Sequence, residues 1–374
     1  MLKKVVGQSL AIRILENSLK NNTVSQAYLF HGPEGCGKIF TAYIFAMAIN
    51  CFSKNERKPC GTCISCRKFL QFSHPDIMFL FPIPNFEMTS NGEIKSQANQ
   101  TEYQKYIQAK IDHPWNDYKF TGNTEIRIDQ IRMIQQKLIT TPYEAEKKVI
   151  VIENIEKMNN QAANAFLKTL EEPSENTVII MTTKTINSLL PTIISRCQRI
   201  EFHPIKSTKI EIYLRHVLSL DPVKAKLISR LSNSNLEKAI VIAKDSNFEN
   251  LEQTTKFFQI LLVRDDQAFL AWQEHVITQS GKNNSILIEI INSMILFLND
   301  IKAFQLCQDD IVNINQVKLI SQFYEQNPYL LESLDQIFYF LEDLQGALKG
   351  HVNPKLVFGY IYNRLGTYFT NMRK

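Results

Sequence analysis

The pattern of apolar residues changes along the chain. Up to about residue 202, short apolar runs alternate with segments whose apolar residues recur every three or four positions, which is typical of strands alternating with helices. The expected strands are 28–30, 77–81, 149–152, 177–181 and 199–202, and the expected helices are 5–20, 42–49, 129–141 and 160–170. This alternation predicts an α/β fold in which helices cover both faces of a parallel sheet.

The rest of the chain has a helical pattern throughout. Beyond Pro204 we expect the short helices Ile210–Leu218, Pro222–Leu231 and Leu236–Asp245, and after about residue 250 the chain is rich in helix. The clearest apolar stripe comprises Leu330, Leu334, Ile337, Phe338, Leu341 and Leu344, which we interpret as core. We therefore expect three domains: an α/β domain over 1–204, a small helical domain over 205–247 and an all-α domain over 248–374.

One segment interrupts the first pattern. Residues 83–122 begin with Pro84, Asn85 and Gly92 in an irregular stretch and continue as a polar, helix-compatible run. Such a segment between two strands is expected to be a surface insertion.

Composition restricts the class of protein. Hydrophobic residues make up 44% and charged residues 21% of the 374, which is ordinary for a globular protein. Apolar runs are shorter than the roughly 18 residues that span a bilayer, and the first residues contain no signal-peptide core, so we expect a cytosolic location. The net charge of +5 is compatible with a nucleic-acid neighbourhood but too small to indicate one.

Four of the seven cysteines are closely spaced. Cys51, Cys60, Cys63 and Cys66 follow the pattern C-x8-C-x2-C-x2-C, which suits four thiolates around a tetrahedral Zn²⁺ ion with no open position for catalysis. Two alternatives are an iron–sulfur cluster and four unligated thiols. Nothing in the neighbouring sequence suggests electron transfer, which disfavours the first. The lysine-rich loop between the first two cysteines is too polar for the second alternative. We expect a structural zinc module at 51–66.

A glycine-rich loop follows the first expected strand. Gly32, Gly35 and Gly37 precede Lys38 and a helix, which is the order of a phosphate-binding loop. The position after the lysine normally carries a hydroxyl that binds magnesium, but here it is Ile39, which cannot ligate a hard cation. The loop is expected to hold phosphate at most, and a chance glycine-rich turn is the alternative.

The strand 149–152 ends in a second candidate for nucleotide chemistry. In P-loop ATPases this strand is followed by two acids, one for the magnesium hydration sphere and one that polarises the attacking water. Here these positions are Glu153, which keeps a carboxylate, and Asn154, which cannot accept a proton. The alternative for Glu153 is an ordinary strand-end carboxylate that faces solvent.

The order of these motifs resembles that of the bacterial DNA polymerase III clamp-loader subunits of the AAA+ class. The residues that carry the resemblance are Gln8, Ala27–Pro33, the glycine-rich loop, the four cysteines, His74-Pro75-Asp76, Asn164–Pro173 and Ser195-Arg196-Cys197. The resemblance is strong over residues 1–202 and loose over 206–245. It implies an AAA+ nucleotide-binding-type domain, a helical lid and a helical collar for oligomerisation.

Three departures from the family pattern surround one site. Ile39 replaces the magnesium-binding hydroxyl, Asn154 replaces the catalytic acid, and Glu237 stands where the family's motor subunit has an arginine that senses the γ-phosphate. The resemblance therefore implies a subunit without its own ATP turnover, with a degenerate phosphate site made of Gly32, Gly35, Gly37, Lys38 and Glu153. ATP or ADP binding at that site stays open.

The resemblance also implies a role in a neighbour's chemistry. Arg196 would be an arginine finger offered in trans to an adjacent ATPase subunit, whereas the alternative is that it pairs with a local carboxylate. The implied partners are the gamma/tau and delta subunits and, through the assembly, the sliding clamp and primed DNA. A gamma/tau-like ATPase with its own turnover and a DNA-reading zinc module are the competing interpretations of the whole chain.

Overall fold

The computed structural model divides into two compact units. One contains the residues up to 213 together with 234–238, and the other contains 214–233 and the residues from 239 onward. The structure describes residues 2–54, 58–87, 94–112, 120, 122–245, 249–281, 284–306, 311, 313, 316–326, 330–350 and 352–370. Each unit is described by itself.

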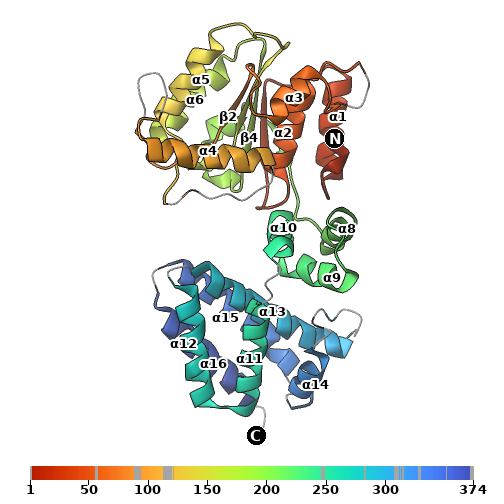
Figure 1. The fold of residues 1–374 in the computed structure, drawn as a ribbon, viewed down its shortest axis with the longest axis vertical. Coiled ribbons are helices and arrows are strands. Elements are labelled where there is room, and N and C mark those ends of the chain that lie inside the picture. Colours follow the sequence, from red (N-terminus) through yellow and green to blue (C-terminus); the bar gives the residue numbers. More distant parts are fainter. Residues whose placement is uncertain are drawn as a thin grey trace. The chain divides into compact units, whose positions relative to one another are not determined.

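The first unit is built on a parallel sheet of five strands in the order β2-β3-β4-β1-β5, which confirms the predicted architecture (Figure 1). The strands are β1 (Ala27–His31), β2 (Ile77–Leu80), β3 (Lys148–Ile152), β4 (Thr177–Thr183) and β5 (Gln198–Glu201). The helices up to the boundary of this unit are η1 (Leu2–Lys4), α1 (Ser9–Lys20), α2 (Lys38–Ile49), α3 (Ile64–Leu70), α4 (Gln97–Asp112), α5 (Ile128–Leu138), η2 (Ile155–Lys157), α6 (Asn160–Glu171), η3 (Ile186–Ser188), α7 (Pro191–Ile194) and α8 (Ser207–Val217).

Alternating side chains of the strands pack on opposite faces of the sheet, as the period of two requires. Tyr28 and Phe30 of β1 contact Phe45 of α2, with ring centroids 5.1 and 6.5 Å away. Leu29, between them, belongs to the cluster formed with α5 and α6. Helices therefore cover both faces, and the loops at the carboxyl ends of the strands lie at one edge (Figure 1).

Several predicted helix boundaries differ from the structure, most clearly at the starts of α1 and α2. The helix expected from residue 5 begins at Ser9, because Gly7 has a φ of +84°, which a right-handed helix cannot contain. The helix expected from Ala42 begins earlier, at Lys38, directly after the left-handed Gly37.

The described part of the predicted surface insertion at 83–122 contains a helix. Helix α4 lies in this segment, and its Tyr106 packs with Phe81 and Phe120 in a separate aromatic cluster. Residues 88–93, 113–119 and 121 of the predicted insertion lie outside the described residues.

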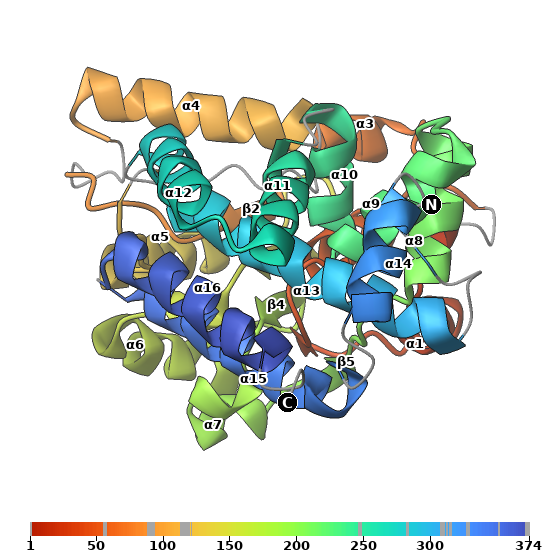
Figure 2. The same ribbon diagram turned by 90° about the horizontal axis from the view of Figure 1, so that it is seen from below.

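The second unit is helical. Its further helices are α9 (Pro222–Leu231), α11 (Glu249–Val263), α12 (Asp266–Ser280), α13 (Asn284–Leu306), α14 (Val317–Gln326), α15 (Leu330–Lys349) and α16 (Pro354–Thr370), while α8 and α10 (Leu236–Asp245) each cross a boundary between the units. Figure 2 shows α15 and α16 side by side. The predicted stripe is core, because Leu334, Ile337 and Leu341 are fully buried. Among the described residues, no helix combines the length and apolarity that crossing a membrane requires.

Candidate functional site

The glycine-rich loop has the predicted strand–loop–helix context. It joins β1 to α2, and Gly35 and Gly37 have φ values of +67° and +86°, which favour glycine. Gly32 lies so close to β5 that a Cβ there would be 2.1 Å from the carbonyl oxygen of Phe202. The loop is therefore shaped by its glycines and held against the sheet.

The ammonium group of Lys38 points into its own loop. Its Nζ donates to the carbonyl oxygens of Gly32 at 2.8 Å and Pro33 at 2.5 Å, and it lies 3.6 Å from the sulfur of Cys36. The residue is only 5% exposed. The positive charge that would bind a phosphate is thus already surrounded by acceptors of the protein.

The start of α10 lies against the same loop, within the same unit. The backbone N–H of Leu236 donates to the carbonyl of Gly35 at 3.0 Å, and a Cβ on Gly35 would be 1.8 Å from Oδ1 of Asn235. Burial raises the pKa of the Cys36 thiol, and the Glu237 carboxylate acts in the same direction, so Glu237 brings negative charge to the loop. A phosphate on this side would meet a covered backbone and a carboxylate.

Glu153 is buried, with 3% of the residue exposed, so the alternative of a solvent-facing carboxylate is wrong. Tyr43 of α2 donates its hydroxyl to one carboxylate oxygen. The other oxygen lies 3.3 Å from Nζ of Lys110 and 3.5 Å from the hydroxyl of Tyr106, both in α4. Asn154, with a left-handed φ of +51°, donates its N–H to Thr182 of β4.

These residues do not fit a magnesium–nucleotide complex. Ile39 offers no oxygen, Lys38 is bonded to backbone carbonyls, and Glu153 already has an ammonium partner. Asn154 cannot take a proton, so it cannot act as the general base at this position.

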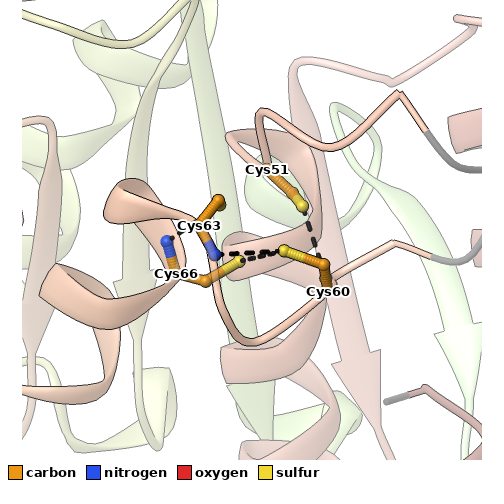
Figure 3. A group of neighbouring side chains, drawn as sticks. All are labelled: Cys51, Cys60, Cys63 and Cys66. Carbon is orange, nitrogen blue, oxygen red and sulfur yellow. Dashed lines mark hydrogen bonds between the residues drawn. The ribbon is translucent and has the colours of Figure 1, made fainter.

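The four predicted zinc ligands converge at the end of α2 and the start of α3 (Figure 3). The sulfur atoms of Cys51, Cys60, Cys63 and Cys66 all lie within 4.8 Å of one another, and those of Cys60 and Cys66 are 3.9 Å apart. Bonds of about 2.3 Å to a tetrahedral zinc ion place sulfurs about 3.8 Å apart. The geometry fits a Cys₄ metal site, although part of the loop between Cys51 and Cys60, Asn55 to Arg57, lies outside the described residues.

Backbone N–H groups donate to three of these four sulfurs, whereas burial raises the pKa of the Cys51 and Cys66 thiols. The N–H groups of Thr62 and Cys63 donate to the sulfur of Cys60 at 3.4 and 3.3 Å, and lower the pKa of its thiol to about 6. The N–H of Cys60 donates to the sulfur of Cys51, and that of Cys66 to the sulfur of Cys63. Such N–H donors stabilise negative sulfur, which is the form that binds metal.

Arg196 lies in the turn between α7 and β5, away from the interior. Its Nη2 donates to Oε1 of Glu171 at 2.8 Å, and its Nη1 donates to the carbonyl of Thr192 at 2.9 Å. The local carboxylate of the alternative interpretation is therefore present, but both side chains are well exposed, at 35% and 48%. Burial raises the pKa of the adjacent Cys197 to about 12, which fits a packed rather than reactive thiol.

Sequence reasoning attributed no physical role to the His74-Pro75-Asp76 motif. Asp76 is 2% exposed, and its carboxylate accepts three backbone N–H groups, from Tyr143 at 2.6 Å and from Glu144 and Ala145 at 2.8 Å each. His74 is buried beside Ser65 of α3, with its Nε2 3.1 Å from the serine hydroxyl. The motif thus fixes the loop before β3, and its only sequence signal was a charged residue directly before an apolar strand.

The chain is similar to subunits of DNA polymerase III. A profile of the family described as "DNA polymerase III, delta subunit" matches residues 7–206. DNA polymerase III subunit delta' of Bacillus subtilis is 27% identical over 268 residues, covering 71% of this chain and 69% of the relative. DNA polymerase III subunit tau of the same organism is 32% identical over 206 residues, but these cover 55% of this chain and only 30% of the relative.

Among solved structures, a gamma subunit-related protein of Thermotoga maritima has a TM-score of 0.44 at 17% identity, covering 96% of this chain and 99% of that one. The family match spans the sheet, the glycine-rich loop, the cysteine cluster and the Arg196 turn. Because it includes more than half of the chain, the protein belongs to the DNA polymerase III delta subunit family.

Proposed function

We propose that this chain is the delta'-type subunit of a bacterial clamp loader, which does not turn over ATP and supplies Arg196 in trans to a neighbouring ATPase subunit. The observation that carries this proposal is a contrast. The chain's own loop and acid are occupied by internal partners, whereas the guanidinium of Arg196 is exposed and held by one carboxylate and one carbonyl.

In this proposed function each region has a task. A guanidinium offered by a neighbour stabilises the charge that develops on the transferring phosphoryl group. The sheet unit holds the Arg196 turn, the lid proposed for 205–247 follows it, and the all-α collar proposed for 248–374 joins the chain to gamma/tau and delta subunits. The assembled loader would place the sliding clamp on primed DNA in the cytoplasm.

The test measures both the binding of partner subunits and ATP hydrolysis by the isolated chain. Immobilised chain is expected to retain gamma/tau and delta, and the purified chain alone is expected to show no multiple-turnover ATP hydrolysis. Turnover by the isolated chain that Lys38→Ala abolishes would establish the competing ATPase function. Failure to retain either subunit would overturn the proposed assembly.

We also propose that Cys51, Cys60, Cys63 and Cys66 hold a structural zinc ion. With four protein ligands, zinc supplies cross-linking of the α2–α3 connection and leaves no position for a substrate. The purified chain should contain one zinc per molecule, and Cys63→Ser should lose it, while Cys197→Ser, outside the cluster, should retain it. Visible absorption typical of an iron–sulfur cluster would contradict the proposal.

A further inference from the structure

A buried ion pair lies where this fold's ATPases hold a metal ion. Glu153 directly follows β3, and its partner Lys110 comes from α4. The two side chains are 4% and 5% exposed, and Nζ lies 3.3 Å from Oε2. A carboxylate and an ammonium group buried together have both lost their hydration, so each requires the other.

Lys110 belongs to α4, a helix of mostly polar residues. Among the described side chains of α4, Tyr106 and Lys110 are the buried ones, and they lie one helical turn apart on the same face. The ring centroid of Tyr106 lies 4.3 Å from that of Phe81 and 4.7 Å from that of Phe120, and these contacts fix the helix on the sheet unit. The next turn then places Lys110 at Glu153.

The surroundings of the ammonium group are built to hold a cation. Nζ of Lys110 lies 5.5 Å from the ring centroid of Tyr106 and 5.8 Å from that of Tyr43, distances at which an aromatic face attracts positive charge. Tyr43 also donates its hydroxyl to the other carboxylate oxygen. Both oxygens of Glu153 are therefore engaged, one by α2 and one by α4.

We infer that Lys110 is the resident cation of Glu153: α4 carries it into the site as an internal replacement for a divalent metal ion. The ammonium neutralises the carboxylate, fastens the insertion to β3 and α2, and removes the acid from metal binding. This gives the described part of the insertion a role, and it does not depend on the trans function of Arg196.

The first arm of the test measures docking of α4 by amide hydrogen exchange in the full, zinc-loaded chain. Lys110→Met and Glu153→Gln should each lower the protection of α4 by about 10²-fold or more, because each leaves a buried charge or polar group without its partner. The double variant should lose less than the two single effects combined. Lys105→Met, an exposed lysine of the same helix, is the control. Protection in Lys110→Met equal to that control would overturn the inference.

The second arm uses Mn²⁺ as the probe, detected by electron paramagnetic resonance. Lys110→Ala opens space beside an unpaired carboxylate, and a hydrated divalent ion is bound through one or two carboxylates. We expect Lys110→Ala to gain a Mn²⁺ site that Lys110→Ala/Glu153→Gln lacks, and the unsubstituted chain to lack it too. A Glu153-dependent site in the unsubstituted chain, or no gain in Lys110→Ala, would overturn the replacement of a metal by the lysine.

Discussion

The ion pairs of Glu153 and Arg196 differ in burial, and the shorter of the two pairs is the more exposed one. The Arg196–Glu171 pair is shorter, at 2.8 Å, than the Lys110–Glu153 pair, at 3.3 Å. However, the first pair is exposed and the second is almost fully buried. In water an ion pair contributes at most about 1 kcal/mol, whereas breaking a buried pair costs about 3–5 kcal/mol. Burial, not distance, therefore determines which charge is committed to the fold.

The same difference separates the glycine-rich loop from the Arg196 turn. At the glycine-rich loop, the buried ammonium group of Lys38 donates to the backbone carbonyls of Gly32 and Pro33. The proposed role of Arg196 requires partners that a phosphate can replace, and its present partners are solvated and hold only part of a guanidinium with five N–H donors. A charge intended for another molecule has to be left with weak partners.

The largest effect is expected for Arg196→Ala. ATP hydrolysis by the reconstituted assembly should fall by about 10³-fold, the lower end of the range for an arginine finger, while the stability of the isolated chain stays within about 0.5 kcal/mol. Steady-state turnover and thermal unfolding measure the two quantities. Arg199→Ala, an exposed arginine of the neighbouring strand, is the control. Unchanged turnover in Arg196→Ala would show that Arg196 does not act as an arginine finger.

The elements on each side of this comparison were not equally predictable from sequence. The strands could be recognised because fully buried parallel strands are continuous apolar runs, as in Val149–Ile152. The cysteine cluster could be recognised because three of its ligands lie within seven consecutive residues, 60–66, so chain geometry alone brings them together. Both signals are local.

The Lys110–Glu153 pair had no such signal. It joins residues 43 positions apart, and α4 has the composition of a solvent-exposed helix. Its burial depends on where Tyr106 packs, which is a property of the tertiary fold. Likewise, the sequence placed an arginine finger at Arg196 by resemblance, but the Glu171 partner follows from the meeting of α6 with the turn after α7.

The second largest effect concerns Asp76, a buried carboxylate that has backbone dipoles instead of an ammonium partner. Burial raises the pKa of Asp76, but the N–H groups of Tyr143, Glu144 and Ala145 lower it more, so its pKa lies below the usual value. Its stabilisation is therefore complete above about pH 4 and is lost as the pH falls through the folded-state pKa. Asp76→Asn should lower the free energy of unfolding by about 2–3 kcal/mol at pH 7.

The check is urea unfolding of this variant and the unsubstituted chain between pH 3 and 7. The difference between the two should shrink below about pH 4, as protonation removes the advantage of the carboxylate. Asp129→Asn, an aspartate whose side chain is 67% exposed, should show neither effect. A difference that does not change with pH would mean that shape, rather than charge, makes Asp76 important.

A smaller effect is expected where Asn235 lies on the glycine-rich loop. Asn235→Ala removes the hydrogen bond from the N–H of Lys238 to Oδ1, at 2.8 Å, and should cost about 1 kcal/mol. Gly35→Ala should cost more, because a methyl group meets that oxygen and the backbone φ is +67°. In the Asn235→Ala background only the backbone strain remains, so the two effects should not add. Additive effects in thermal unfolding would show that α10 does not cover the loop.

The smallest effect is expected for Glu171→Ala. Since both members of the Arg196 pair are exposed, the variant should lose less than about 1 kcal/mol of stability, and less still in 1 M salt, where charges are screened within about 3 Å. Glu172→Ala, which removes the neighbouring exposed carboxylate, is the control. Urea unfolding at low and high salt measures the difference. A loss of several kcal/mol would mean that Arg196 is committed to its own fold, and the contrast with Glu153 would disappear.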